Sequence, residues 1–85
     1  MTHRASRQFW RHYRMLPAAV QRLADKNFDL LKSNPRHPSL QFKTVGRMWS
    51  ARVGAHYRAL AVKSGNELVW FWIGSHAEYN EIIKR

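Results

Sequence analysis

Two arginines, two histidines and a tyrosine stand at the ends of three predicted strands, at spacings that would bring them to one edge of a sheet. The segments 49–53, 57–62 and 68–73 are predicted to form an antiparallel meander, in which the end of the first strand, the start of the second and the end of the third meet. The side chains gathered there are Arg52, His56, Arg58, His76 and Tyr79. Guanidinium groups bind phosphate, and imidazole and phenol groups transfer protons, so this set is suited to holding and cleaving a phosphodiester. No metal-ligand set accompanies it.

The charge of the chain favours a polyanionic partner. Its 85 residues carry 15 Lys and Arg against 5 Asp and Glu, a formal net charge of +10 at pH 7. Nucleic acid and an acidic protein are both candidates for that partner. A membrane partner is not expected, because no segment approaches the roughly 20 apolar residues of a spanning helix and the N-terminal residues lack the apolar core of a signal peptide. We therefore expect a soluble, cytoplasmic protein.

The length predicts one domain over residues 1–85 with a small aromatic core. A chain this short buries only about 60% of the surface of its unfolded form, and each buried aromatic removes roughly 150–250 Å² from water. Four Trp, four Phe and three Tyr are therefore expected to supply much of the core. The absence of cysteine excludes a disulfide framework and a thiolate metal site. Trp10 is the aromatic that we expect to be left for a partner.

Helices are expected in the first half of the chain and strands in the second. Ser6 can cap a short first helix, and Pro17 suits the first turn of a second helix that stops at Asn34. A short strand is expected within 40–45, where apolar and polar residues alternate. Residues 77–84 are predicted to add one or two helical turns.

The run 68–73 is apolar on both faces, which is typical of an interior strand covered on both sides. A meander of three strands would leave it at an edge. Residues 1–5 as a fourth strand, the C-terminal segment and a bound partner are the alternatives for covering it. The predicted fold class is therefore α+β, with two N-terminal helices packed on a small antiparallel sheet of three to four strands and a short C-terminal helix.

Three strings in this order resemble the RelE/ParE superfamily of bacterial toxins from type II toxin-antitoxin pairs. The first is Asn34-Pro35 at the end of a helical segment, with Pro38-Ser39-Leu40 after it. The second is Trp-x-x-Arg-Val-Gly-x-x-Tyr-Arg at 49–58, and the third is Ile-Gly-x-His-x-x-Tyr at 73–79. The resemblance extends from about Phe9 to Ile83 and implies a RelE/ParE-like fold without a cofactor.

The ribonuclease members of the superfamily imply an activity: a metal-independent, ribosome-dependent mRNA endoribonuclease, or mRNA interferase, that inhibits translation. A base takes the proton from a ribose 2′-OH, which attacks the adjacent phosphate, and an acid protonates the leaving 5′-oxygen. The residues that the resemblance makes catalytic are His56, Arg58, His76 and Tyr79. Either histidine would be the base, and the other histidine or Tyr79 the acid. Arg52 matches a position that binds phosphate in the family. Lys43 and Arg47 belong to a second basic group before the strands, and we expect them to bind substrate by positioning phosphate, or to form an antitoxin-binding surface.

Two positions depart from the family pattern and keep other functions open. Ser50 stands where the best-known ribosome-dependent members have a lysine used in proton transfer, and His56 stands where some members carry a carboxylate. The alternatives are a ParE-like inhibitor of DNA gyrase that acts by protein contact and a non-catalytic binding module with the toxin fold. Each function implies a cognate antitoxin protein, which allows a hetero-oligomer with it. The ribonuclease hypothesis adds the ribosome and mRNA as partners.

Overall fold

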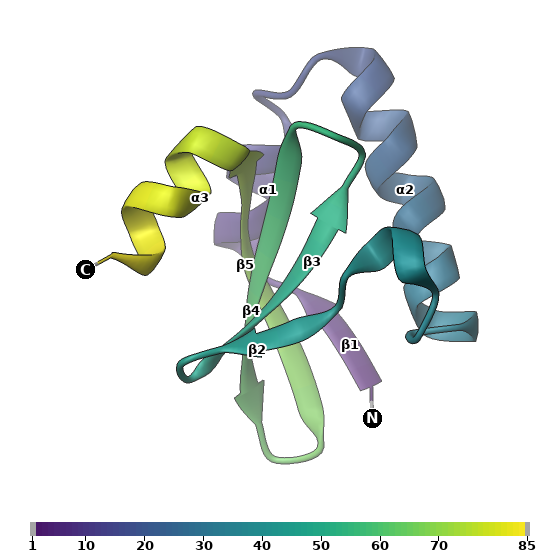
Figure 1. Cartoon of the computed structure of the whole chain (residues 1–85), viewed down its shortest axis with the longest axis vertical. Helices are drawn as coiled ribbons and strands as arrows, with labels where there is room; N and C mark the ends of the chain where they lie inside the picture. The colour runs from purple at the N-terminus through teal and green to yellow at the C-terminus, as the bar shows by residue number, and fades with distance from the viewer. Residues whose placement is uncertain (1, 85) are drawn as a thin grey trace.

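The computed structural model describes residues 2–84, which form an α+β fold with one five-stranded sheet (Figure 1). The N-terminal elements are β1 (Thr2–Ala5), α1 (Arg7–Tyr13), α2 (Ala18–Ser33) and a 3₁₀ turn (Pro38–Leu40). The remaining elements are β2 (Lys43–Val45), β3 (Met48–Val53), β4 (Tyr57–Ser64), β5 (Glu67–Ser75) and α3 (His76–Ile83). No helix among the described residues is long and apolar enough to cross a membrane.

The sheet has the order β1-β5-β4-β3-β2, and β1 runs parallel to β5 while the other neighbours are antiparallel. The prediction of a purely antiparallel sheet of three to four strands is therefore wrong in strand number and in the direction of β1. The prediction that the apolar run lies inside the sheet is confirmed, because β5 has β1 on one side and β4 on the other. Of the three alternatives for covering it, the N-terminal strand is the one found.

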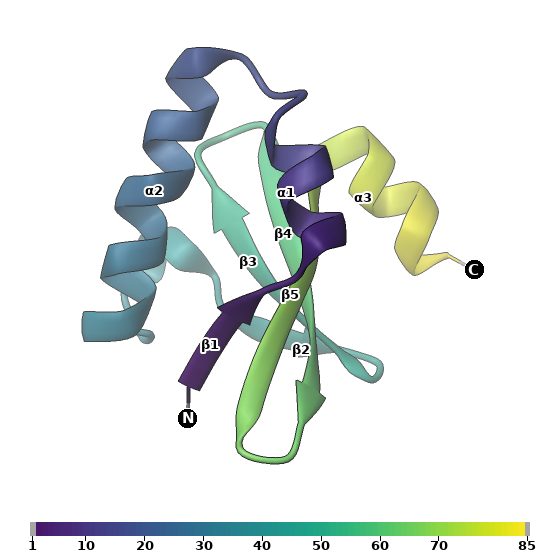
Figure 2. The same ribbon diagram turned by 180° about the vertical axis from the view of Figure 1, so that it is seen from behind.

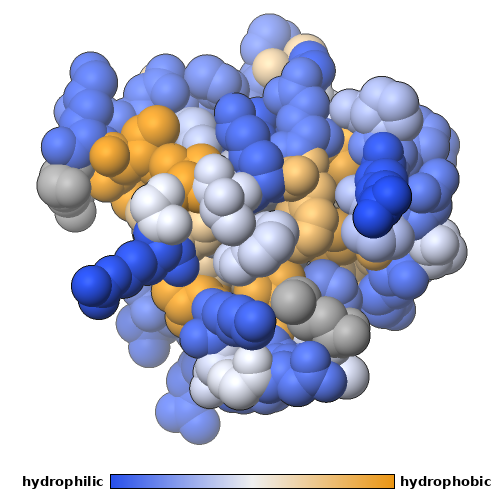
Figure 3. Space-filling view, turned by 60° about the horizontal axis from the view of Figure 1, so that its bottom comes forward, coloured by the Kyte–Doolittle hydropathy of each residue, from blue (hydrophilic) through white to orange (hydrophobic). Residues whose placement is uncertain are grey.

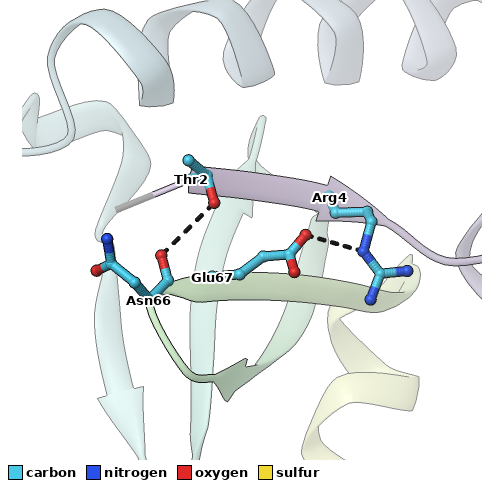
Figure 4. A network of polar contacts seen from close by, with 4 residues as sticks. All are labelled: Thr2, Arg4, Asn66 and Glu67. Carbon is cyan, nitrogen blue, oxygen red and sulfur yellow. Dashed lines mark hydrogen bonds and ion pairs between the residues drawn. The ribbon is translucent and has the colours of Figure 1, made fainter.

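Polar contacts hold the short β1 on β5 (Figure 4). Arg4 Nε donates to Glu67 Oε1 at 2.8 Å, and the Thr2 hydroxyl reaches the Asn66 carbonyl oxygen at 3.5 Å. Exposed ion pairs of this kind are worth at most about 1 kcal/mol. The parallel ladder from Thr2 opposite Glu67 to Ala5 opposite Trp70 therefore contributes the greater part of the attachment.

The helix boundaries follow the caps in the sequence. Ser6 accepts a hydrogen bond from the backbone N–H of Phe9 at 3.2 Å, and α2 begins directly after Pro17. Ser75 and Glu78 form a capping box that fixes the start of α3. The predicted C-terminal helix is therefore confirmed, and it begins at the point where β5 ends.

The two faces of the sheet carry separate apolar clusters. Helices α1 and α2 lie over one face (Figure 2), where the larger cluster includes Ala59, Leu68 and Trp70. On the other face, Leu60, Trp72 and Tyr79 form a smaller cluster with α3. Figure 3 shows apolar side chains across the middle of one face, bordered by polar ones.

A β-bulge allows β5 to supply both clusters. Leu60 of β4 faces Trp72, and the next residue, Ala61, faces Trp70, so that three residues of β5 oppose two of β4. Trp70 and Trp72 are two positions apart and would share a face of a regular strand. The extra residue, Phe71, turns them to opposite clusters.

Candidate active site

The five side chains predicted to converge lie at one end of the sheet, around the start of β4 and the end of β5. Arg52 and Arg58 are directly opposite each other on β3 and β4, and Gly74 faces Arg58 from β5. The backbone N–H of His76 donates to the His56 carbonyl oxygen at 2.8 Å, which joins the β3–β4 turn to the start of α3. The backbone therefore brings these residues together, whereas their chemical roles stay predictions.

Arg58 is the buried centre of this group, with a relative exposure of 3%. Its Nε donates to the Ser50 hydroxyl at 2.9 Å, its Nη1 to Gln41 Oε1 at 3.2 Å and its Nη2 to the Gln41 backbone oxygen at 3.4 Å. The guanidinium carbon lies 4.9 Å from the centroid of the Tyr79 ring. Three of the five N–H donors of the guanidinium are used in these contacts, and Tyr79 also acts on the group through a side-chain hydrogen bond.

The electrostatics of Arg58 favour an anion. Ion pairs of the described residues join other side chains, and none gives Arg58 a carboxylate. Burial lowers the pKa of Arg58, and Arg52 opposite acts in the same direction, whereas Tyr79 opposes the shift. An arginine stays protonated in proteins, so the result is a cation that has lost hydration without gaining a counter-charge. Such a cation interacts more strongly with an incoming oxyanion than an exposed one does.

Ser50 gives the buried Arg58 guanidinium a hydrogen-bond acceptor. It is fully buried and offers its hydroxyl oxygen to the Arg58 Nε. A lysine at this position would place a second cation against the guanidinium. Serine at position 50 instead accepts a hydrogen bond from Arg58 without adding charge.

Arg52 is opposite Arg58 but is anchored elsewhere. Its Nε donates to the Gly54 backbone oxygen at 2.8 Å, over the β3–β4 turn. Gly54 has φ +65°, and a Cβ there would come within 2.5 Å of Leu23 Cδ2, so the turn requires glycine. Arg52 is half-buried and is thereby fixed at the border of the Arg58 site.

The two histidines are exposed, and His76 lies next to the buried Tyr79. The His76 ring centroid is 5.7 Å from that of Tyr79, and its Nδ1 is 3.2 Å from Asn80 Nδ2. Tyr79 is 5% exposed and contacts both Arg58 and His76. His56 lies in the β3–β4 turn, two positions before Arg58. Both imidazoles are accessible to a substrate that approaches this end of the sheet.

The two predicted substrate-binding residues before β3, Lys43 and Arg47, lie in different parts of the structure. Lys43 is exposed and faces Ser50 across β2 and β3, close to the Arg58 site. Arg47 lies in the β2–β3 turn, at the opposite end of β3 from Arg52. The structure thus groups Lys43 with the site and leaves Arg47 outside it.

Gln41 and the structural role of Ser50 were not predicted. Gln41 follows the 3₁₀ turn in a left-handed conformation, with φ 43° and ψ 45°. Nothing in its sequence neighbourhood marks it as a partner of Arg58, 17 positions away. The position of Ser50 could have been predicted, because it is two residues before Arg52 on a strand and therefore lies on the same face as the arginines.

Solved structures of bacterial and archaeal toxins have this fold. YafQ from Escherichia coli strain BL21(DE3) matches with a TM-score of 0.72 and 14% identity, covering 91% of this chain and 94% of that one. RelE in the RelB-RelE antitoxin-toxin complex from Methanococcus jannaschii matches with a TM-score of 0.70 and 13% identity, covering 93% and 96%. The isolated E. coli RelE toxin matches with a TM-score of 0.63 and 14% identity, covering 99% and 96%. At these identities the likeness establishes the fold.

Sequence comparison supplies the family. A comparison with curated proteins found no match. The family model described as "ParE-like toxin domain" matches residues 18–81, which is most of the chain and includes Arg52, Arg58 and Tyr79. The fold, the order of its elements and this match agree, and the chain belongs to the family of ParE-like toxin domains.

Proposed function

We propose that the chain is the toxin of a type II toxin-antitoxin pair and that it cleaves mRNA on the ribosome without a metal ion. The observation that carries this proposal is Arg58, a buried guanidinium with no carboxylate partner among the described residues. Exposed His76 lies against Tyr79, which contacts Arg58, and exposed His56 is two positions before Arg58 in the chain. Together they provide a charge to bind a phosphodiester and groups that can move protons.

In the proposed reaction, the ribose 2′-oxygen attacks the adjacent phosphorus while a histidine, His56 or His76, takes the 2′-OH proton. The P–O5′ bond breaks, the other histidine or Tyr79 protonates the 5′-oxygen, and a 2′,3′-cyclic phosphate and a 5′-OH result. Arg58 binds the extra negative charge on the phosphoryl oxygens, and Arg52 adds positive charge from the neighbouring strand. Lys43 contributes to holding the RNA backbone.

Inhibition of DNA gyrase by protein contact is the second candidate. The matching family description is ParE-like, and serine replaces the proton-transferring lysine of the best-known ribosome-dependent members at position 50. In that case the arginines and histidines would serve the fold or a protein contact. A non-catalytic module that retains only antitoxin binding is the remaining alternative.

One pair of assays separates these functions. Purified protein is added to ribosomes programmed with a defined mRNA, whose 5′ ends are mapped by primer extension, and in parallel to a gyrase supercoiling reaction. We expect metal-independent cleavage in the ribosomal A site, its loss in Arg58→Met, and normal cleavage by Arg22→Met, an exposed arginine of α2. Blocked supercoiling with intact mRNA would establish the second candidate instead.

The histidines can be tested by the pH dependence of single-turnover cleavage. Imidazole transfers protons efficiently near neutral pH, so replacing the base by glutamine should lower the rate by roughly 10²- to 10⁴-fold and alter the pH-rate profile. His56→Gln and His76→Gln are compared with the wild type on the same ribosomes. If neither substitution changes rate or profile, the histidine mechanism is wrong and Tyr79 or the ribosome supplies the proton transfer.

The antitoxin partner is also a proposal, supported by relatives that were crystallised as RelB-RelE complexes. We assign its docking surface to a pocket of about 280 Å³ between α1, α2 and the sheet, whose apolar walls include Phe9, Phe28 and Trp70. Trp10 is 42% exposed and also lines this pocket. Exposed arginines of α1 and the turn after it lie nearby in sequence: Arg7, Arg11 and Arg14. An acidic amphipathic segment fits this combination of apolar pocket and positive charge.

Titration calorimetry with the protein encoded beside this chain tests that assignment. Trp10→Ala should weaken binding at least tenfold, because aromatic anchors in pockets dominate interface energies. Met15→Ala is the matched control, since Met15 is 82% exposed and does not line this pocket. Equal affinities of both variants for that protein would place the interface elsewhere.

A further inference from the structure

The groups that cover the Arg58 guanidinium differ in their exposure to solvent. Ser50 beneath it is fully buried, and Tyr79 beside it is 5% exposed. Tyr79 belongs to α3, which is held by the Ser75–Glu78 capping box and by packing of its apolar residues on the sheet. Gln41 is the exposed member of the described residues that hydrogen-bond the guanidinium. Moving the exposed Gln41 side chain is therefore the smallest rearrangement that would open Arg58 to solvent.

Gln41 presents two oxygens to the same guanidinium. Its left-handed backbone follows the 3₁₀ turn, and its N–H donates to the Pro38 carbonyl oxygen at 3.3 Å. This conformation directs both the backbone oxygen and Oε1 at the terminal nitrogens of Arg58, at 3.4 and 3.2 Å. Two oxygens on Nη1 and Nη2 are the arrangement that a carboxylate or phosphate makes with arginine.

We infer that the Gln41 side chain is a gate over the oxyanion site, whose Oε1 occupies the place of a phosphate oxygen on Arg58 Nη1. An incoming phosphodiester displaces the amide, while the backbone oxygen of residue 41 continues to hold Nη2. The residue at position 41 then sets the oxyanion affinity of the site. This inference rests on the proposed function only in taking Arg58 as the group that binds phosphate.

The gate makes opposite predictions for two substitutions at one position. Gln41→Ala removes the competing oxygen and keeps the backbone, so inorganic phosphate and a non-cleavable 2′-O-methyl dinucleotide should bind roughly 3- to 10-fold more tightly. Gln41→Glu supplies a carboxylate that pairs with Arg58, so both probes should bind at least about tenfold more weakly. A residue that only positions Arg58 would give weaker binding in Gln41→Ala.

Nuclear magnetic resonance titrations of the full chain measure these affinities, with the backbone N–H signals of Gly74 and Tyr79, which lie beside the guanidinium and are present in every variant, as the readout. Gln8→Ala is the matched control, because Gln8 is exposed on α1 and should leave phosphate affinity unchanged. Thermal unfolding checks each variant. If Gln41→Ala is poorly folded, Gln41→Met, which keeps the length of the side chain without its oxygen, replaces it and should also bind more tightly.

The outcomes separate the gate from the proposed function. Phosphate binding that is lost in Arg58→Met but unchanged or weaker in Gln41→Ala would overturn the gate and leave the oxyanion site standing. Phosphate binding that survives in Arg58→Met would overturn both the site and the gate. An absence of detectable binding in both the wild type and Gln41→Ala would also overturn the gate, since it requires the opened site to bind.

Discussion

The two faces of the sheet differ in the size of their apolar clusters and in their buried polar residues. One face is covered by α1 and α2 and is called the helix-covered face. On it, ten buried apolar residues form a cluster, and partly buried aromatic rings pack against that cluster. On the α3 face, the buried apolar cluster has three members, and the buried polar residues Ser50 and Arg58 lie on the same face. A small domain has little core to spare. We infer that the face covered by α1 and α2 contributes most of the stability. The α3 face can then hold Arg58, which has no carboxylate partner among the described residues.

The largest effect that tests this division is on stability, at Leu68. This β5 residue is fully buried in the helix-side cluster, so Leu68→Ala should lower the free energy of unfolding by about 2–5 kcal/mol. Urea unfolding measures the loss, and cleavage by the remaining folded protein should be unchanged per molecule.

Val62→Ala is the control for that substitution, because Val62 is a β4 residue that is 40% exposed. It should cost less than about 1 kcal/mol. If the two substitutions cost the same, the helix-covered face does not dominate stability and the comparison of the faces is wrong. Leu68→Val provides a smaller step if Leu68→Ala is largely unfolded.

On the α3 face the expected effect is on chemistry, at Arg58. Arg58→Met keeps most of the side-chain volume and removes a buried charge without a carboxylate partner, so the free energy of unfolding should change by no more than about 1 kcal/mol. Cleavage should fall by roughly 10²- to 10³-fold, as for other losses of charge stabilisation in a transition state. A destabilisation of about 3 kcal/mol or more would identify Arg58 as a structural residue, and the proposed difference between the two faces of the sheet would be wrong.

The elements of the fold were predictable because local signals specify them. Ser6 caps α1, Pro17 precedes α2, and the apolar run of β5 indicates an interior strand. A strand at residues 1–5 was only one of three alternatives, and its parallel direction was not predicted. The strand has only four residues, most of them polar, and its pairing is decided by the free side of β5. The bulge at Phe71 was hidden, because a run that is apolar on both faces gives no alternation from which a register shift can be seen.

The candidate site was predictable in its location but not in its structure. Strand ends and turns determine where Arg52, Arg58 and His76 lie, and these follow from sequence. The burial of Arg58 does not, because a sheet edge was expected to leave it accessible, whereas Tyr79 and Gln41 cover it. Gln41 depends on a left-handed backbone and on a contact between distant segments, for which a single sequence has no signal.

A smaller effect is expected at His3, a polar residue on the helix-covered face, whose protonation should change the stability of that face. His3 of β1 stacks on Trp70 with ring centroids 6.1 Å apart, and its Nδ1 accepts a hydrogen bond from Trp70 Nε1 at 3.1 Å. Burial lowers the pKa of His3, and nearby positive charge, including that of Lys32, lowers it further. The fold therefore favours the neutral ring, and protonation at Nδ1 removes the lone pair that Trp70 uses.

The sign of the pH dependence follows from that preference. The contribution of His3 to stability is fully present above the pKa of an unfolded histidine, about 6.5, and is lost as the pH falls through the lower value in the fold. His3→Gln keeps an oxygen that can accept the Trp70 bond but does not titrate. Between pH 7.5 and 5, the urea midpoint of the wild type should therefore fall more than that of His3→Gln. Gln8→Ala, which replaces an exposed residue that does not titrate, should keep the wild-type slope. Parallel slopes for His3→Gln and the wild type would mean that the Trp70 contact does not depend on the protonation of His3, and that the helix-covered face is insensitive to pH in this range.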